Sequence, residues 1–187
     1  MKKLYYIFSM LIGLSLYSCN DFLSQTAPDE LTSDSFWRNL DDAEAGISAA
    51  YSQLEFSIDT WAFAEVRWPV EAYREDLVNL GSDAMNYLNW VELSNFTYTN
   101  GNSQVSSYWW NNYDGASFSS QVIEKVPTIP EGKISEDKRT QIVNEAHFLR
   151  GYYHLKLILN WDEIVVRDQY ITSQADLSKA LSSRTDA

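Results

Sequence analysis

The segment from Ser135 to Trp161 constrains the fold most strongly, because its apolar residues keep a helical spacing over the whole length. Ser135 is a typical N-cap residue, and Glu136 and Asp137 place negative charge in the first helical turn. One apolar stripe comprises Ile142, Ala146, Leu149, Tyr153 and Leu157, and a second comprises Phe148, Tyr152, Leu155 and Leu159. A helix apolar over so much of its circumference has to be covered on more than one side. We therefore expect it to be the central helix of the fold.

The same helical spacing recurs at two places before this segment. A helix is expected to start near Asp41, with acidic residues in its first turn. Its apolar face comprises Ala43, Ile47, Ala50, Tyr51, Leu54 and Ile58. Another helix is expected from about Ser103 to Val126, where Pro127 stops it. The short connection to the central helix predicts an antiparallel, tetratricopeptide-like hairpin, and hence an all-α fold.

Residues 59–103, called the aromatic excursion below, are rich in rings and asparagines, and their helical spacing is patchy. The rings are Trp61, Phe63, Trp68, Tyr73, Tyr87, Trp90, Phe96 and Tyr98, and the asparagines are Asn79, Asn86, Asn89, Asn95, Asn100 and Asn102. Two short helices are expected, around 61–79 and 83–93, with Gly81 between them. Rings beside amides suit a carbohydrate, since a sugar stacks its C–H face on a ring while amides meet its hydroxyls. The alternative is that these rings belong to the core.

Residues 1–19 have the layout of a bacterial lipoprotein signal, in which Lys2 and Lys3 precede an apolar run from Leu4 to Leu16. As a helix this run would rise about 20 Å, short of the roughly 30 Å hydrocarbon core of a bilayer. The run ends in Leu-Tyr-Ser-Cys, which looks like a lipobox with Cys19 as its last residue. We expect acylation of Cys19, with palmitate among the chains, and the alternative is a buried or free thiol. More than one acyl chain suffices for stable anchoring without a membrane span.

These features divide the chain into three expected parts. Residues 1–18 are a signal peptide, residues 19–32 are a lipidated tether that Pro28 breaks, and residues 33–187 are one helical domain. With 187 residues, of which 45% are hydrophobic, the chain is long enough for an ordinary core.

Charge and motifs limit the functions that are open to such a chain. The formal net charge of −12 makes a nucleic-acid backbone a poor partner, whereas neutral ligands remain open. A single cysteine excludes an internal disulfide and a cluster of soft metal ligands, and no metal or cofactor is expected. The sequence has no HExxH, GxSxG, CxxC or glycine-rich phosphate motif. Carboxylates within the excursion, namely Glu65, Glu71, Glu75 and Asp76, leave a glycosidase pair open by residue type.

Four passages together resemble a known family. They are Cys19 to Leu23; Pro28, Leu31, Thr32 and Phe36-Trp37; Asp42, Ala43, Ala49, Ala50, Tyr51 and Leu54; and Glu145, Ala146, Phe148, Leu149, Arg150, Gly151, Tyr152 and Tyr153. In this order they resemble the N-terminal part of the SusD-like (RagB/SusD) outer-membrane lipoproteins of Bacteroidota. The chain departs from the family where His147 and Gly151 replace the usual Arg and Ala, and where Asn160 to Val165 replaces a Phe-Gly-Asp-Val-Pro sequence.

The resemblance implies a surface-exposed lipoprotein that binds glycans or other nutrients and acts as a lid on a SusC-like TonB-dependent transporter. Members are not enzymes, and they run well beyond this length, so the chain is expected to be a fragment or a truncated product. By general position, the resemblance favours Arg74, Asn86, Tyr87, Asn89 and Trp90 as candidate ligand residues. Two alternatives stay open: a lipid-anchored glycoside hydrolase, and a structural fragment that binds nothing without its missing C-terminal part.

Overall fold

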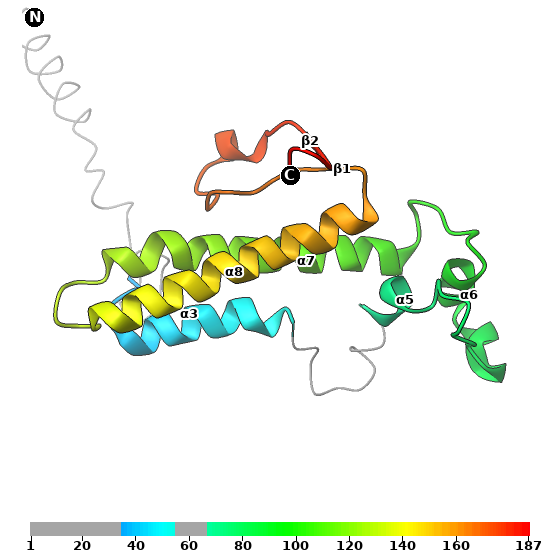
Figure 1. Cartoon of the computed structure of the whole chain (residues 1–187), viewed down its shortest axis with the longest axis horizontal. Coiled ribbons are helices and arrows are strands. Elements are labelled where there is room, and N and C mark those ends of the chain that lie inside the picture. Colours follow the sequence, from blue (N-terminus) through cyan, green and yellow to red (C-terminus); the bar gives the residue numbers. More distant parts are fainter. Residues whose placement is uncertain (1–34, 55–66) are drawn as a thin grey trace, which may run out of the picture. The chain divides into compact units, whose positions relative to one another are not determined.

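The computed structural model describes residues 35–54 and 67–187, apart from the side chains of residues 84 and 85, and these parts are mainly helical (Figure 1). Residues 37–187 form one compact unit, which is the part described below. The predicted all-α class is confirmed. The predicted signal peptide, the tether and Cys19 lie outside the described residues, and so do Trp61, Phe63 and Glu65.

Three long helices form the body of the unit: α3 (Leu40–Ser52), α7 (Ser103–Lys125) and α8 (Glu136–Asn160). Helix α8 packs along α7, and both contact α3 (Figure 1). A short 3-10 turn, η2 (Val126–Thr128), and a turn with Gly132 at positive φ connect α7 to α8. The guanidinium of Arg139 donates to the carbonyls of Val126 and Ile129, which fixes the connection against the first turns of α8. The predicted helical hairpin is therefore present.

The start and the first stripe of α8 agree with the sequence prediction. Ser135 is the N-cap, and its hydroxyl accepts a hydrogen bond from the amide of Lys138 at 3.3 Å. The residues of the first stripe are all buried. Among them, the hydroxyl of Tyr153 donates to the carbonyl of Ala50 at 2.6 Å, and its ring lies over Gly115. One side chain of α8 thus contacts both other long helices.

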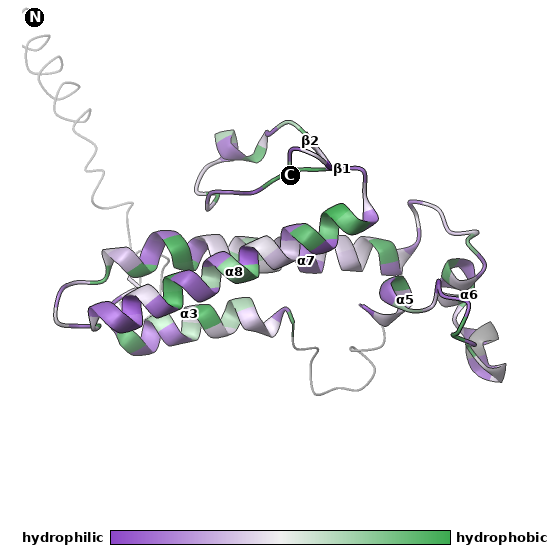
Figure 2. Ribbon diagram, in the orientation of Figure 1, coloured by the Kyte–Doolittle hydropathy of each residue, from purple (hydrophilic) through white to green (hydrophobic). Residues whose placement is uncertain are grey.

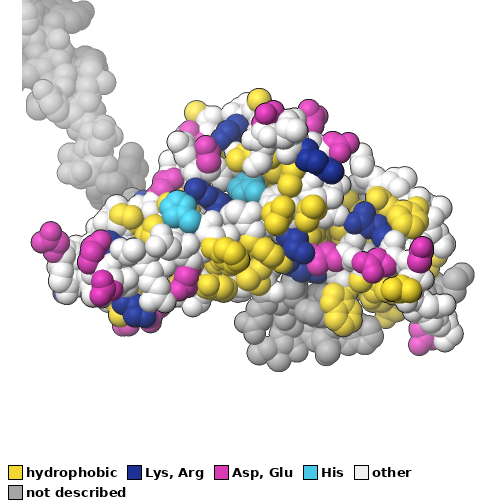
Figure 3. Space-filling view, in the orientation of Figure 1, with side chains coloured by type: hydrophobic (Ala, Val, Ile, Leu, Met, Phe, Trp, Pro, Cys, Tyr) yellow, Lys and Arg dark blue, Asp and Glu magenta, His cyan; other side chains and the backbone are white. Residues whose placement is uncertain are grey.

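The second stripe of α8 differs from the prediction. The side chains of Phe148, Leu155 and Leu159 are 70%, 51% and 62% exposed, and Tyr152 is half-buried. Figure 2 shows the apolar C-terminal end of α8, and Figure 3 shows hydrophobic side chains gathered over the middle of this helix. The expectation that α8 is covered on more than one side is wrong for this stripe, because α3 and α7 both pack against the first stripe.

The two helices before α8 begin with side-chain caps. Asn39 caps α3 by accepting from the amide of Asp42 at 3.1 Å, and α3 ends at Ser52, before the predicted Ile58. Asn102 caps α7 and accepts from the amides of Gln104 and Val105. The predicted span from Ser103 to Val126 agrees with α7 to within a residue.

The aromatic excursion contains three short elements: α5 (Trp68–Glu71), η1 (Ser82–Asn86) and α6 (Leu88–Ser94). The second predicted helix corresponds to η1 and α6, whereas the first is reduced, in the described residues, to the single turn α5. After α8, Ile164 pairs in an antiparallel register with Ser182, which joins β1 (Glu163–Ile164) to β2 (Ser182–Ser183). The 3-10 turn η3 (Gln174–Leu177) lies between these two strands in the sequence.

Candidate functional site

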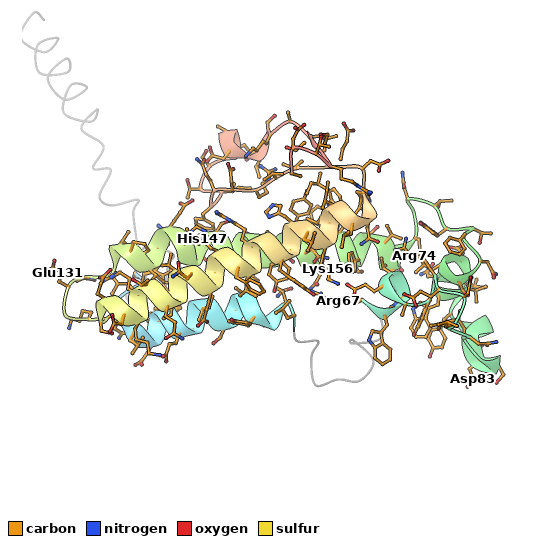
Figure 4. The ribbon with its side chains drawn as sticks, viewed as in Figure 1. Arg67, Arg74, Asp83, Glu131, His147 and Lys156 are labelled. Carbon is orange, nitrogen blue, oxygen red and sulfur yellow. The ribbon has the colours of Figure 1, made fainter. Side chains whose placement is uncertain are left out.

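Four of the five predicted ligand residues lie together, and the fifth lies at a neighbouring helix. Asn86 is the last residue of η1, Tyr87 is the N-cap residue of α6, and Asn89 and Trp90 are in the first turn of α6. Arg74 follows α5, close to the C-terminal end of α8 (Figure 4). The site therefore has an aromatic part on α6 and a cationic part beside α8.

The aromatic part is a cluster of three rings, Tyr73, Tyr87 and Trp90, called the ring cluster below. Tyr87 stacks on Trp90 with 4.2 Å between ring centroids and 12° between ring planes. Tyr73 meets Trp90 edge to face at 5.5 Å. All three side chains are partly exposed, and burial raises the pKa of the Tyr73 hydroxyl. The rings thus hold one another in place while part of their surface meets solvent.

Asn89 and Asn102 attach α6 to the start of α7. The side-chain amide of Asn89 donates to the Ser103 hydroxyl at 2.7 Å. The side-chain amide of Asn102 donates to the backbone carbonyl of Asn89 and to the Glu92 carboxylate, both at 2.9 Å. These contacts fix the backbone of the helix that carries Trp90.

Arg74 holds the excursion against α8. Its guanidinium donates to the Val70 carbonyl at 2.8 Å, to the Tyr98 hydroxyl at 3.3 Å and to the side-chain oxygen of Asn160 at 2.6 Å. A guanidinium has five N–H groups, so a ligand can still be bound by those that these acceptors leave over.

A polar network under the excursion was not predicted from the sequence. Glu71 accepts a hydrogen bond from the Tyr108 hydroxyl at 2.7 Å and pairs with Lys156 at 3.1 Å. Arg67, which is 5% exposed, donates to the Tyr152 hydroxyl and to the Gln53 carbonyl, both at 3.1 Å. Figure 4 shows Arg67 and Lys156 on neighbouring elements.

This polar network lies beside a small apolar core, and the sequence predicts only part of it. Burial, and then the hydrogen bond to Glu71, raise the pKa of the Tyr108 hydroxyl. The ring of Tyr108 packs with Val70 and Leu93 in a small core between α5, α6 and α7. Arg67 and Glu71 are four residues apart, a spacing that predicts an ion pair on one face of a helix. Their hydrogen bonds to Tyr152 and Tyr108 join residues far apart in the sequence, so no local pattern predicts them.

Two further features bear on the kind of site. Within residues 35–54 and 67–187, no helix combines the length and apolarity that crossing a bilayer requires. The same residues contain no group of three or more His, Cys, Asp or Glu side chains arranged to hold a metal ion.

Two of three comparisons with known proteins find a protein that is similar to this chain. A search against models of protein families finds no match. The chain is 28% identical over 158 residues to SusD-like protein P2 of Formosa agariphila, an alignment that covers 83% of this chain and 29% of that protein. A SusD superfamily protein from Bacteroides vulgatus matches the fold with a TM-score of 0.63 at 19% identity, over 81% of this chain and 32% of that one.

These comparisons confirm the resemblance that the sequence motifs indicated: the chain is similar in sequence to a SusD-like protein and similar in fold to a SusD superfamily protein. The chain spans less than a third of the length of either relative, and this partial coverage fits an N-terminal part.

Proposed function

We propose that this chain is the N-terminal part of a lipid-anchored outer-membrane surface protein that binds glycans or other nutrients and delivers them to a SusC-like TonB-dependent transporter. Its similarity to SusD-like proteins supports a role in nutrient binding. The transporter and the surface location are parts of this proposal that rest on the resemblance. The anchor rests on the sequence around Cys19, and the net charge of −12 makes nucleic acid a poor partner.

The ring cluster is the observation that carries the binding proposal. The stacked pair of Tyr87 and Trp90 presents partly exposed ring surface, and the amide of Asn86 next to it is exposed. Trp68, on α5, is 51% exposed and adds a further ring to the same excursion. A sugar ring stacks on such faces through its C–H groups, and amides bind its hydroxyls. Because these rings are only partly buried, they are poorly explained as core alone.

Binding without turnover is the form of the proposal that the contacts favour. Glu71 already accepts the hydrogen bond of Tyr108 and pairs with Lys156, so it serves the internal network. Glu75 and Asp76 lie on the exposed surface of the excursion. A retaining or inverting glycosidase needs two carboxyl groups that face each other across the scissile bond.

The test is a titration of the full chain, purified in a detergent whose headgroup is not a sugar. Tryptophan fluorescence is followed during addition of neutral gluco-, manno-, galacto- and xylo-oligosaccharides, and each mixture is then separated by thin-layer chromatography. We expect a saturable change with intact sugars that Trp90→Ala abolishes. Phe148→Ala removes another exposed ring, on α8, and is the matched control that should keep binding.

Two other results of this titration would favour the alternative functions, a glycoside hydrolase or a structural fragment. Shortened sugars on the chromatogram would replace the proposal with a glycoside hydrolase. A chain that unfolds cooperatively but responds to no sugar would be a structural fragment.

A further inference from the structure

A cavity of about 330 Å³ lies between the middle of α7 and the segment of residues 165–177. It shares no lining residue with the ring cluster. Its volume is within the range of about 300–1,000 Å³ that small-molecule sites occupy. It is therefore large enough for a short ligand, and the nature of its lining decides which kind.

Three aromatic residues of α7 line the cavity: Trp109, Trp110 and Tyr113. The ring of Trp109 packs against Tyr113 at 4.8 Å and meets Trp161 edge to face at 4.9 Å. Trp110, in contrast, is 64% exposed. An indole that is left so open at a cavity offers a flat apolar surface on which a ligand ring can stack.

Polar side chains lie among these rings. Asp114, Ser117 and Gln169 also line the cavity. Asp114 and Gln169 are exposed and Ser117 is half-buried, and within the described residues these side chains have no protein hydrogen-bond partner, so a ligand can bind them. Partial burial raises the pKa of the Asp114 carboxyl. A carboxylate in such surroundings gains from hydrogen-bond donors, and a polyhydroxylated ligand supplies several of them.

The wall opposite α7 is fixed by hydrogen bonds. The Tyr113 hydroxyl accepts from the amide of Val165 at 2.8 Å and donates to the carbonyl of the same residue at 3.0 Å. The guanidinium of Arg167 donates to the carbonyls of Asp176 and Leu177, and its backbone amide donates to His154. The cavity is thus formed before a ligand arrives, which lowers the cost of binding.

The charges that line the cavity balance each other. Arg167 and Asp114 contribute one positive and one negative charge, so the lining has no formal net charge with which to favour an anion or a cation. We propose that this cavity is a second saccharide-binding site, where a neutral sugar ring stacks on Trp110 and its hydroxyls bind Asp114, Ser117 and Gln169. This site does not depend on the ring cluster, and the two can be tested separately.

The experiment uses the full chain labelled with 5-fluorotryptophan, in the same detergent, and ¹⁹F NMR resolves its seven tryptophans. Trp110→Phe and Trp90→Phe assign the signals of the two sites. The neutral oligosaccharides named above are the probes, and glucuronate oligosaccharides and an aliphatic alcohol are the comparison ligands. Near-ultraviolet circular dichroism checks that each variant keeps its packing.

We expect a neutral sugar to shift the Trp110 signal saturably. Gln169→Ala and Asp114→Ala should each weaken that binding by about tenfold. Trp90→Ala should leave it unchanged. The proposal is overturned if no sugar in the panel moves the Trp110 signal saturably, if Trp90→Ala removes the response, or if glucuronate or the alcohol binds as well. A response of Trp110 with a silent Trp90 would overturn the proposed ring-cluster site alone.

Discussion

The ring of Tyr153 in α8 lies directly over Gly115 in α7, so closely that a β-carbon at position 115 would overlap it. The Tyr153 hydroxyl reaches past this contact to the carbonyl of Ala50 in α3. The crossing of the three long helices therefore depends on a residue without a side chain, since only a hydrogen leaves room for the ring.

Gly115→Ala should destabilise the chain by about 1–3 kcal/mol, because the overlap with Tyr153 outweighs the gain in helix propensity. Urea unfolding followed by circular dichroism measures this change. Gly151→Ala is the matched control: it is also within a long helix, where an added β-carbon meets nothing within 4 Å. It should stabilise the chain by up to about 1 kcal/mol. Equal effects of the two substitutions would contradict the close contact.

Stability should fall in mild acid because of His154. A carbonyl can only accept, so the contact of Nδ1 with Arg150 O at 2.8 Å places the ring proton on Nδ1. Nε2 accepts from the Arg167 amide at 2.9 Å and loses this bond when it is protonated. Burial is the main cause that lowers the pKa of His154. The hydrogen bond to the Arg150 carbonyl and the charge of Asp168 raise this pKa, whereas the charges of Arg150 and Lys179 lower it further.

The direction of the pH effect follows from this lowered pKa. The unfolded chain takes up the proton first, at about pH 6.5, so the stability contribution is complete above that pH and is lost as the pH falls towards the folded pKa. Unfolding free energies measured between about pH 7.5 and pH 5.5 should show this loss. His154→Gln should flatten it, and His147→Gln, on the same helix, should not. An unchanged slope in His154→Gln would remove the explanation.

Replacement of Arg67 by methionine should cost about 3–5 kcal/mol, since it removes one partner of a buried charged network. Its guanidinium holds Tyr152 and the end of α3, and it lies 3.8 Å from Glu71. Chemical denaturation is the measurement. Arg38→Met, which removes a guanidinium that is 59% exposed and pairs with Asp42, should have a much smaller effect. A loss in Arg67→Met no larger than in Arg38→Met would show that the network adds little.

Asn102→Ala should loosen the ring cluster as well as α7. The loss of the cap costs about 0.5–2 kcal/mol, and the two bonds to Asn89 and Glu92 are lost with it. We expect a weaker near-ultraviolet signal from the stacked Tyr87 and Trp90. Asn39→Ala removes a similar cap from α3 and should leave that signal intact. The same spectral change in both variants would contradict a local effect.

Much of the helical body could be predicted because its signals are local. The cap at Ser135 and the first stripe of α8 are set by residues that are near one another in the sequence. The end of α3 at Ser52 and the short α5 were missed, because apolar spacing continues beyond both helices as the structure has them. The second stripe of α8 was misinterpreted, since apolar spacing indicates a helical face but not whether another element covers it.

Composition marked the excursion as rich in rings and amides, and the resemblance favoured five residues within it, but neither could predict their contacts. Four of these residues lie together between the end of η1 and the first turn of α6. The contacts of Arg74 with Asn160 and of Arg67 with Tyr152 join residues 86 and 85 positions apart, and no local pattern specifies them. The cavity beside Trp110 depends on how residues 165–177 return to α7, which the sequence does not indicate either.

The guanidinium of Arg139, bound to the carbonyls of Val126 and Ile129, closes the α7–α8 hairpin over a separation of only 13 and 10 residues. Short loops close at a small entropic cost, whereas the contacts of Arg74 with Asn160 and of Arg67 with Tyr152, which hold the excursion against α8, must close far longer ones. The hairpin is thus positioned to form early in folding, with the excursion joining a scaffold that already exists. In the native state the order reverses: the ring cluster is expected to open first, and its amides to exchange with solvent before those of the hairpin.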